Sequence, residues 1–142
     1  MQALNFLPSR HRVFTTACAL TIAMAGLTGS VQAATPTELS TAYATQAGAA
    51  AQAERGRQFF TTTHGKEWSC ASCHTALATQ AGKHASTGKL IAAMAPAVNA
   101  ERLTDPAKVE KWFRRNCNDV VGRECSALEK ADVMSWLIAL KP

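Results

Sequence analysis

The sequence predicts an all-α domain, and three observations carry this prediction. Two segments open with a capping residue followed at once by proline, Thr35-Pro36 and Asp105-Pro106, which is typical of helix starts. Ser126 and Glu129 form a capping box ahead of a third segment with helical periodicity. No segment shows a convincing alternation of apolar and polar residues, the pattern expected of a strand.

The first half of this domain should contain two helices and a loop. The first helix begins after Thr35, where Glu38 closes a capping box, and pauses near Gly48. An alanine-rich stretch follows, and the second helix should run over about residues 50–60. We expect loop structure over 61–66 and again from Ser69 onward.

The second half should contain two more helices after an irregular segment. Glycines and a proline break residues 75–99 into short turns and loops. A helix resumes after Asp105 and should end near Arg115 or Asn116. The last helix runs from Ser126 to Leu140, with an apolar stripe formed by Val133, Trp136, Leu137 and Leu140.

The N-terminus has the pattern of a secretory signal. Basic residues at 10–12 precede an apolar, uncharged run over 13–27, and small residues at 28–33 suit a signal peptidase. The apolar run has about 15 residues, fewer than the roughly 20 that span a bilayer, which favours a cleaved signal over an anchor. We therefore predict a signal peptide at residues 1–33, a single mature domain at 34–142 and a periplasmic location.

The net charge of the predicted mature chain bears on whether it binds nucleic acid. The formal net charge is +5, and removal of 1–33 takes away Arg10 and Arg12 but no acid, so the charge falls to +3. Nucleic-acid binding usually needs a concentrated basic patch. This modest charge gives no support for a nucleic-acid partner.

The segment Cys70-Ala71-Ser72-Cys73-His74 carries the clearest chemistry in the chain. Two cysteines separated by two residues and followed by histidine are typical of covalent haem attachment, in which each thiol bonds one haem vinyl group. The histidine follows at once, so its ring can reach the iron. The motif predicts one haem c, bound through Cys70, Cys73 and His74, with His74 as an iron ligand.

Two other chemistries use the same cysteine spacing. A dithiol redox pair is expected beside a βαβ pattern, which this sequence lacks. A zinc site needs further ligands, and Cys117 and Cys125 would supply two. These two cysteines enclose a short polar loop, and in an oxidising compartment a disulfide between them is the simpler outcome. The adjacent histidine and the export signal favour haem.

The second axial ligand of the iron decides the function. A strong ligand makes an electron carrier, whereas a weak or missing ligand leaves a position for gas. The candidates are Met94, Met134, His64, His84 and Asn116. Met94 lies in a loop after the haem motif, where small electron-transfer cytochromes usually carry a methionine ligand, although it would also serve as core filler. We expect Met134 in the core and both histidines at the surface.

Asn116 is the least conventional of these candidates. It continues a helical stripe formed by Val109, Trp112 and Phe113, so it should face inward. A buried, unpaired amide costs roughly 1–3 kcal/mol, and ferric iron would give it a partner. Asparagine also commonly ends helices, and on spacing alone a C-terminal cap is the simpler interpretation. Both interpretations stay open on the residues alone.

Several segments of the chain follow the order found in one bacterial family. Besides the haem motif they are 53–57, 81–82, 87–89, 109–112, 115–118, 122–125 and 129–132. Over nearly all of the predicted mature chain this order resembles the sphaeroides haem protein family of monohaem cytochromes c. The stretch from Asn116 to Cys125 is the specific part, because ordinary cytochromes c lack it.

The resemblance implies a class I cytochrome c-like fold with an added N-terminal helical segment. In that fold Gly56 would permit close approach of the terminal helices, and Phe59 or Phe60 would meet Trp136. The family's sixth iron ligand is the asparagine directly before the first disulfide cysteine. That ligand corresponds to Asn116 here, and the disulfide to Cys117–Cys125.

The resemblance also implies function. Family members bind oxygen or nitric oxide when reduced, and are thought to receive electrons from a dihaem cytochrome c and a membrane cytochrome b. An amide oxygen is a hard donor that suits Fe(III) better than Fe(II), so reduction should release Asn116.

Two functions from different classes therefore stay open. One is a gas-binding haem protein, with oxidoreductase activity toward oxygen or nitrogen oxides undecided. The other is a simple electron carrier with Met94 on the iron. Lys108, Lys111 and Arg115 share the outer face of one predicted helix. They suit an acidic redox partner in either case, or form a solvated helix face.

Overall fold

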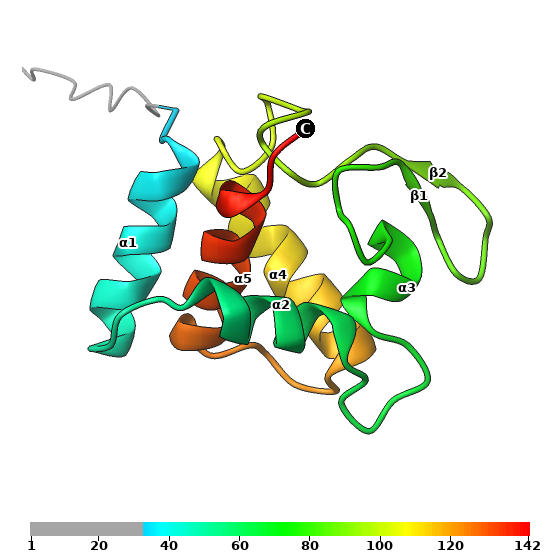
Figure 1. Ribbon diagram of the computed structural model, residues 1–142. Coiled ribbons are helices and arrows are strands. Elements are labelled where there is room, and N and C mark those ends of the chain that lie inside the picture. The colour runs from blue at the N-terminus through cyan, green and yellow to red at the C-terminus, as the bar shows by residue number, and fades with distance from the viewer. Residues whose placement is uncertain (1–32) are drawn as a thin grey trace, which may run out of the picture. The chain divides into compact units, whose positions relative to one another are not determined.

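The computed structural model describes residues 33–142, which lie within the single unit Val31–Pro142. The predicted signal peptide, residues 1–33, lies outside the described residues except for Ala33. The described chain is mainly helical, which confirms the all-α prediction (Figure 1). Its elements are α1 (Pro36–Ala47), α2 (Ala53–Thr61), α3 (Cys70–His74), β1 (Gly82–Lys83), β2 (Leu90–Ile91), α4 (Pro106–Val120) and α5 (Ala127–Ala139).

The helix starts are those predicted from local residue patterns. Thr35 and Glu38 form the capping box of α1, with the Thr35 hydroxyl 3.1 Å from the Glu38 N–H. Asp105 caps α4 by accepting from the Lys108 N–H at 2.9 Å. A second capping box opens α5 at Ser126. Each cap satisfies backbone donors that a helix start leaves unpaired.

Two helix boundaries differ from the prediction. The second helix begins at Ala53 and not near residue 50, because the Gln52 N–H donates to the Asp132 carboxylate at 2.7 Å and Gln52 stays extended. The predicted end of the third long helix near residue 116 was wrong: α4 continues to Val120. Val120 is buried, so the apolar face of α4 extends one turn further than expected.

Two short features were not predicted. The expected loop after Ser69 contains α3, a single helical turn opened by a Ser69–Ser72 capping box. β1 and β2 form a two-residue antiparallel pair in which Gly82 lies opposite Ile91. A side chain at Gly82 would overlap the Cys73 carbonyl oxygen, so glycine allows β1 to lie directly against α3.

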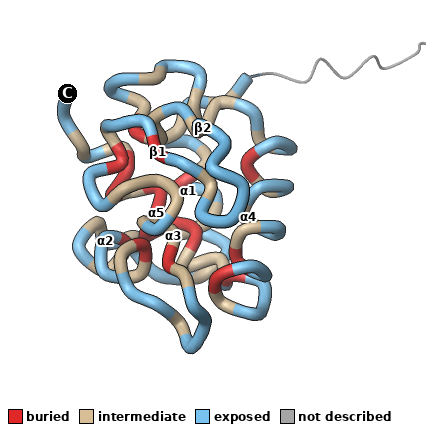
Figure 2. Tube along the Cα trace, turned by 90° about the vertical axis from the view of Figure 1, so that its right-hand side faces the viewer, coloured by how far each residue is buried: buried red, intermediate tan, exposed pale blue. Residues whose placement is uncertain are grey.

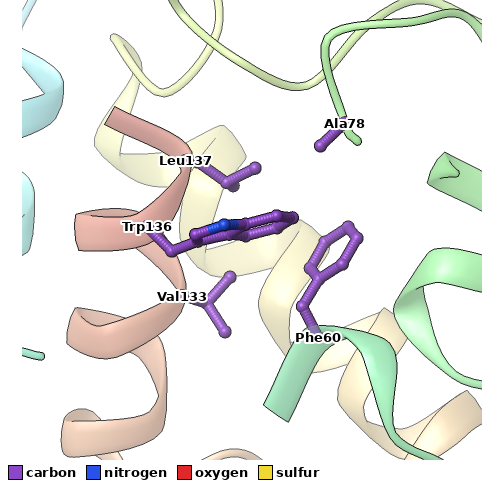
Figure 3. Close-up of a cluster of buried hydrophobic side chains, with 5 residues drawn as sticks. All are labelled: Phe60, Ala78, Val133, Trp136 and Leu137. Carbon is purple, nitrogen blue, oxygen red and sulfur yellow. The ribbon is translucent and has the colours of Figure 1, made fainter. Parts of the chain in front are cut away.

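The core lies mainly between α5 and α2, which crosses α5, while α1 packs along another side of α5 (Figure 1). Figure 3 shows its central cluster, formed by Phe60, Ala78, Val133, Trp136 and Leu137. The Phe60 and Trp136 ring centroids are 4.7 Å apart, so Phe60 is the aromatic residue that meets Trp136. Gly56 has no side chain at the point where the Asp132 backbone passes, which confirms the expected close approach.

The segment between α3 and α4 contributes little to this core. Its buried residues are Ala78, Gly82 and Ala95, and most of the remainder is exposed or half-buried (Figure 2). The backbone N–H groups of Met94 and Ala95 both donate to the Ala78 carbonyl, at 2.9 and 3.0 Å. These two bonds join distant parts of the segment to each other, at Ala78, which belongs to the core cluster.

Two ion pairs with buried members tie the helices together. Asp132 of α5, 2 % exposed, accepts hydrogen bonds from the Arg55 guanidinium of α2, in addition to the Gln52 N–H. Lys130, two residues before Asp132 and 8 % exposed, donates to both carboxylate oxygens of Glu110 on α4. A buried charge is tolerated only when it is paired in this way, which gives these charged residues a structural role.

Candidate haem site

α3 gathers the three residues of the haem motif in one helical turn. Cys70 and Cys73 are free and half-buried. Burial raises the pKa of the Cys70 thiol to about 11, so this group stays a neutral thiol at neutral pH. Both sulfurs are thus available for thioether bonds, and within the described chain they are not committed to a disulfide.

His74 has the properties of a neutral imidazole ligand. Burial, with a smaller contribution from the positive charge of Arg102, lowers the pKa of His74 to about 4. The ring is therefore uncharged at neutral pH, which is the form that binds metals. Its Nδ1 atom is buried and has no hydrogen-bond partner within the described chain. An unpaired buried nitrogen beside two free thiols fits a haem iron site.

The zinc site and the dithiol redox pair, the two alternatives to haem attachment, agree less well with the structure. Cys117 and Cys125 form a disulfide with their Cα atoms 5.6 Å apart, as predicted, so neither thiol is available to zinc. In residues 33–142 no group of three or more His, Cys, Asp and Glu side chains gathers as a metal site would require. The dithiol pair also lacks the βαβ surroundings of a redox motif.

Met94 packs against the core cluster, where it is half-buried. Its backbone N–H is bonded to Ala78, four residues after His74. A methionine that fills space at the edge of the core would have such an environment. Met134 is fully buried within α5, as predicted for a core residue.

Each of the two other candidate histidines, His64 and His84, has one ring nitrogen in a hydrogen bond. The Nε2 atom of His64 lies 2.8 Å from the Phe59 carbonyl oxygen, and the Phe59 and His64 rings lie 4.3 Å apart, tilted by 35°. The Nδ1 atom of His84 bonds the Ser86 hydroxyl and the Thr87 N–H. Both histidines are half-buried, somewhat more than the surface position predicted for them.

Asn116 lies within α4, four residues before its end. The C-terminal cap is Val121, so the cap interpretation of Asn116 was wrong. The nearby Asn118 amide donates to the Arg114 carbonyl at 2.8 Å, whereas the Asn116 amide has no such partner among the described residues. Asn116 is half-buried and next to Cys117, whose disulfide restrains this end of α4.

One member of the predicted α4 stripe was misplaced. Val109 is buried and Phe113 half-buried, but Trp112 is 44 % exposed and lies under the Arg115 guanidinium at 5.6 Å. Helical spacing puts Asn116 between Val109 and Trp112 around the helix axis. Asn116 therefore stands at the border between the packed face of α4 and a face that the protein leaves uncovered.

The two predicted iron ligands lie on α3 and α4, and each of these helices has a side chain beside the same hydrophobic cluster. The Phe60 ring lies 6.2 Å from the His74 ring, and Phe113, one turn before Asn116, packs against the cluster that contains Phe60. α3 itself lies against α2 and β1. The two predicted iron ligands thus belong to separate elements around one apolar region.

Sequence reasoning missed the exposed apolar residues. Besides Trp112, the large hydrophobic side chains left exposed in the described chain are Leu77, Leu90 and Val98, all between α3 and α4. Leu90 is 68 % exposed. Apolar side chains of this size are suited to cover a largely apolar porphyrin. The available signal was their position, because they are large apolar residues in a segment that is otherwise rich in alanine and small polar residues.

No described helix is long and apolar enough to cross a membrane. Residues 46–137 match a family described only as a domain of unknown function, DUF1924.

Two characterised relatives give the comparison more content. The chain is 51% identical over 108 residues to cytochrome c-type protein SHP of Cereibacter sphaeroides, covering 73% of this chain and 83% of the relative. It is 48% identical over 79 residues to cytochrome c'' of Methylophilus methylotrophus, covering 56% and 55% of the two chains.

Solved structures extend the similarity to the fold. One is oxidised SHP, described as an oxygen-binding cytochrome c, with 49% identity and a TM-score of 0.72 over 75% of this chain and 98% of that chain. Another is oxidised cytochrome c'' from M. methylotrophus, with 38% identity and a TM-score of 0.68 over 75% and 95%. A solution structure of cytochrome c'', described in terms of haem-ligand detachment, has 37% identity and a TM-score of 0.67 over 75% and 94%.

Proposed function

The chain belongs to the SHP family of c-type cytochromes, and we propose that it is an exported monohaem cytochrome that binds oxygen or nitric oxide at ferrous haem. The gas would take the position that Asn116 holds in the ferric protein. The oxygen binding described for SHP and the ligand detachment described for cytochrome c'' support this proposal.

Cys70 and Cys73 are the residues that would hold the haem c covalently, and His74 would bind its iron. When bound, the haem would supply a redox-active iron that can take a small ligand. The buried environment keeps the imidazole of His74 neutral, and this is how the chain provides a permanent ligand on one side.

Asn116 would hold the second axial position. The single observation that carries this assignment is a half-buried amide at the edge of the packed face of α4, without a hydrogen-bond partner among the described residues, on a helix that continues past it. An amide oxygen is a hard donor, so it prefers Fe(III) to the softer Fe(II). Binding of ferrous iron by Asn116 would therefore be weak, and the residue that holds the ferric form would give way to a gas ligand.

The proposal includes an export route and redox partners. Residues 1–33 would be removed as a signal peptide, and the domain at 34–142 would act in the periplasm. A dihaem cytochrome c and a membrane cytochrome b are the proposed electron donors. Lys108, Lys111 and Arg115 are all exposed on α4 and would favour an acidic partner surface.

The test is a comparison of Asn116→Ala with Met94→Leu by absorption spectroscopy. In the wild-type protein the ferrous haem should be high-spin and bind carbon monoxide without denaturation. Asn116→Ala should leave the ferric iron open to water or added anions, because the amide oxygen is gone. Met94→Leu is the matched control and should leave both spectra nearly unchanged, since it substitutes one core side chain for another of similar volume.

The electron-carrier function predicts the reverse pattern. A methionine ligand would give a charge-transfer band in the ferric spectrum, low-spin ferrous iron and slow gas binding. If Met94→Leu removes the sixth ligand and Asn116→Ala does not, the proposed function is wrong.

A further inference from the structure

α4 is attached to the rest of the domain differently from the other long helices. α1 and α2 both pack closely against α5, whereas α4 does not approach another described helix to that extent. Its C-terminal end is tied by the Cys117–Cys125 disulfide. Its N-terminal end follows Thr104, whose carbonyl accepts from the Ala34 N–H at 3.0 Å. The position of its middle therefore depends on a small number of side-chain contacts.

One set of these contacts centres on Glu110. The Tyr43 hydroxyl of α1 donates to Glu110 Oε2 at 2.8 Å. The Lys130 ammonium of α5 donates to both oxygens of the same carboxylate, at 2.8 and 2.9 Å. Lys130 also lies 5.3 Å from the centre of the Tyr43 ring, within the range of a cation–π interaction. One carboxylate of α4 thus joins two other helices.

The hydrogen bonds in this cluster favour the protonation states that form them. Hydrogen bonds from Lys130 lower the pKa of Glu110, which keeps the carboxylate ionised. Burial and the neighbouring Glu110 carboxylate raise the pKa of Tyr43 above its ordinary range, so its hydroxyl keeps the proton that it donates. Lys130 is 8 % exposed, and its buried charge would be left unpaired if α4 moved away.

The same tyrosine also contacts the residue one turn before Asn116. The Tyr43 and Phe113 rings meet edge to face, with centroids 6.0 Å apart. Residues three apart on a helix share a face, so Phe113 and Asn116 move together with the backbone of α4. Contacts made by Tyr43 therefore bear directly on the position of the Asn116 amide.

We propose that Tyr43, Glu110 and Lys130, which we call the α4 clamp, are positioning residues that hold Asn116 toward the haem iron. This inference rests on the proposed role of Asn116 as a ligand. An exogenous ligand reaches the ferric iron when α4 shifts and the amide withdraws. The clamp, which joins α1 and α5 to the middle of α4, sets how often that shift occurs.

The size of the effect follows from a two-state competition. The apparent dissociation constant of an added ligand equals its intrinsic value divided by the fraction of protein in which Asn116 has withdrawn. Loss of a hydrogen bond to a carboxylate changes the ratio of withdrawn to bound Asn116 by about tenfold if the bond exists only while Asn116 is bound. The change is smaller here, because part of that bond survives when Asn116 has withdrawn. Loss of the Tyr43 hydroxyl should therefore raise the affinity for an added ligand by about three- to tenfold.

The experiment titrates imidazole into the ferric holoprotein and follows the haem absorption. Tyr43→Phe removes the hydroxyl but keeps the ring against Phe113, and Glu110→Gln keeps the shape but removes the charge. Both should bind imidazole more tightly than the wild-type protein. The matched control is Asp132→Asn, which weakens a buried ion pair between α2 and α5 without touching α4. The control should bind imidazole as the wild-type protein does, even though its melting temperature falls.

Hydrogen exchange gives a second measurement that does not depend on ligand binding. Amide protection in residues 109–120 should fall in Tyr43→Phe and Glu110→Gln, and should stay at the wild-type level in Asp132→Asn. A melting temperature alone would fall in all three variants, so a purely structural role would not produce this separation.

Asn116→Ala distinguishes failure of this inference from failure of the proposed function. If Asn116→Ala tightens imidazole binding and both clamp variants do so to a smaller extent, the clamp is supported. If Asn116→Ala tightens binding but the clamp variants match the wild-type protein, Asn116 withdraws by side-chain rotation alone and the clamp is refuted. If Asn116→Ala binds imidazole as the wild-type protein does, the ligand assignment fails, and the proposed clamp function fails with it.

Discussion

Replacement of Gly56 by alanine tests the closest helix contact in the domain. A Cβ atom at this position would lie 1.9 Å from the Asp132 carbonyl oxygen and 2.8 Å from the Val133 nitrogen. Ordinary contact begins near 3.4 Å, so the carbonyl oxygen is too close by about 1.5 Å. Both neighbouring atoms belong to the α5 backbone, and neither can turn aside as a flexible side chain would.

The expected cost combines several opposing contributions. Alanine favours the helical conformation of α2 by about 1 kcal/mol relative to glycine. Forcing α2 and α5 apart costs about 1–3 kcal/mol as overpacking. It also loosens the contact between the Phe60 and Trp136 rings, worth about 1 kcal/mol, and stretches the Arg55–Asp132 ion pair. We expect a net loss of about 2–3 kcal/mol in the free energy of unfolding.

The assay is guanidinium unfolding of the holoprotein, followed by far-ultraviolet circular dichroism. Gly88→Ala is the matched control, because a Cβ there would meet nothing within 4 Å although φ is +68°. The control should lose about 1 kcal/mol, from backbone strain alone. If Gly56→Ala is as stable as the wild-type protein, or loses no more than Gly88→Ala, the helices do not cross as closely as we describe.

The disulfide and the α5 capping box give two more measurable expectations. Cys117→Ser/Cys125→Ser should lower the free energy of unfolding by about 2–3 kcal/mol, because the disulfide restrains the unfolded chain and the ring that it closes is short. An unchanged melting temperature in calorimetry would contradict this expectation. The ion pair with Arg123, together with the capping box, lowers the pKa of Glu129 to about 2. A lowered pKa adds stability above the unfolded value of 4.5, and that stability is lost as the pH falls toward 2. The free energy of unfolding should therefore fall between pH 6 and pH 3 by about 1 kcal/mol less in Glu129→Gln than in the wild-type protein. The difference is modest because Arg123 is mostly in solvent. If the two proteins lose the same stability between these pH values, the expectation is wrong.

Short-range features of this protein were predictable from its sequence. The helix starts at Thr35, Asp105 and Ser126 depend on side chains within three residues of the backbone groups that they cap. The haem motif is local in the same sense, because its two thiols and its histidine occupy one turn of α3. Interactions confined to one turn leave a direct pattern in the sequence.

Other features depend on residues that are distant along the chain. The start of α2 is set by Asp132, 80 residues away from Gln52, and no local pattern identifies that carboxylate as the partner. The Glu110–Lys130 pair and the Tyr43 hydroxyl bond likewise join separate helices. Charged residues on a helix usually face solvent, so no local pattern predicts that these residues pair across helices.

The candidate iron ligands show most clearly which features are local in the sequence and which depend on tertiary structure. Sequence alone determined that Cys70, Cys73 and His74 form a haem motif, and that Asn116 falls near the inward face of a helix. Tertiary structure decided that α4 continues past Asn116, that Trp112 is exposed and that half-buried Met94 packs against the core cluster. Helical periodicity states which side chains share a face, but burial depends on what packs against that face, and that is fixed by contacts between elements far apart in the chain.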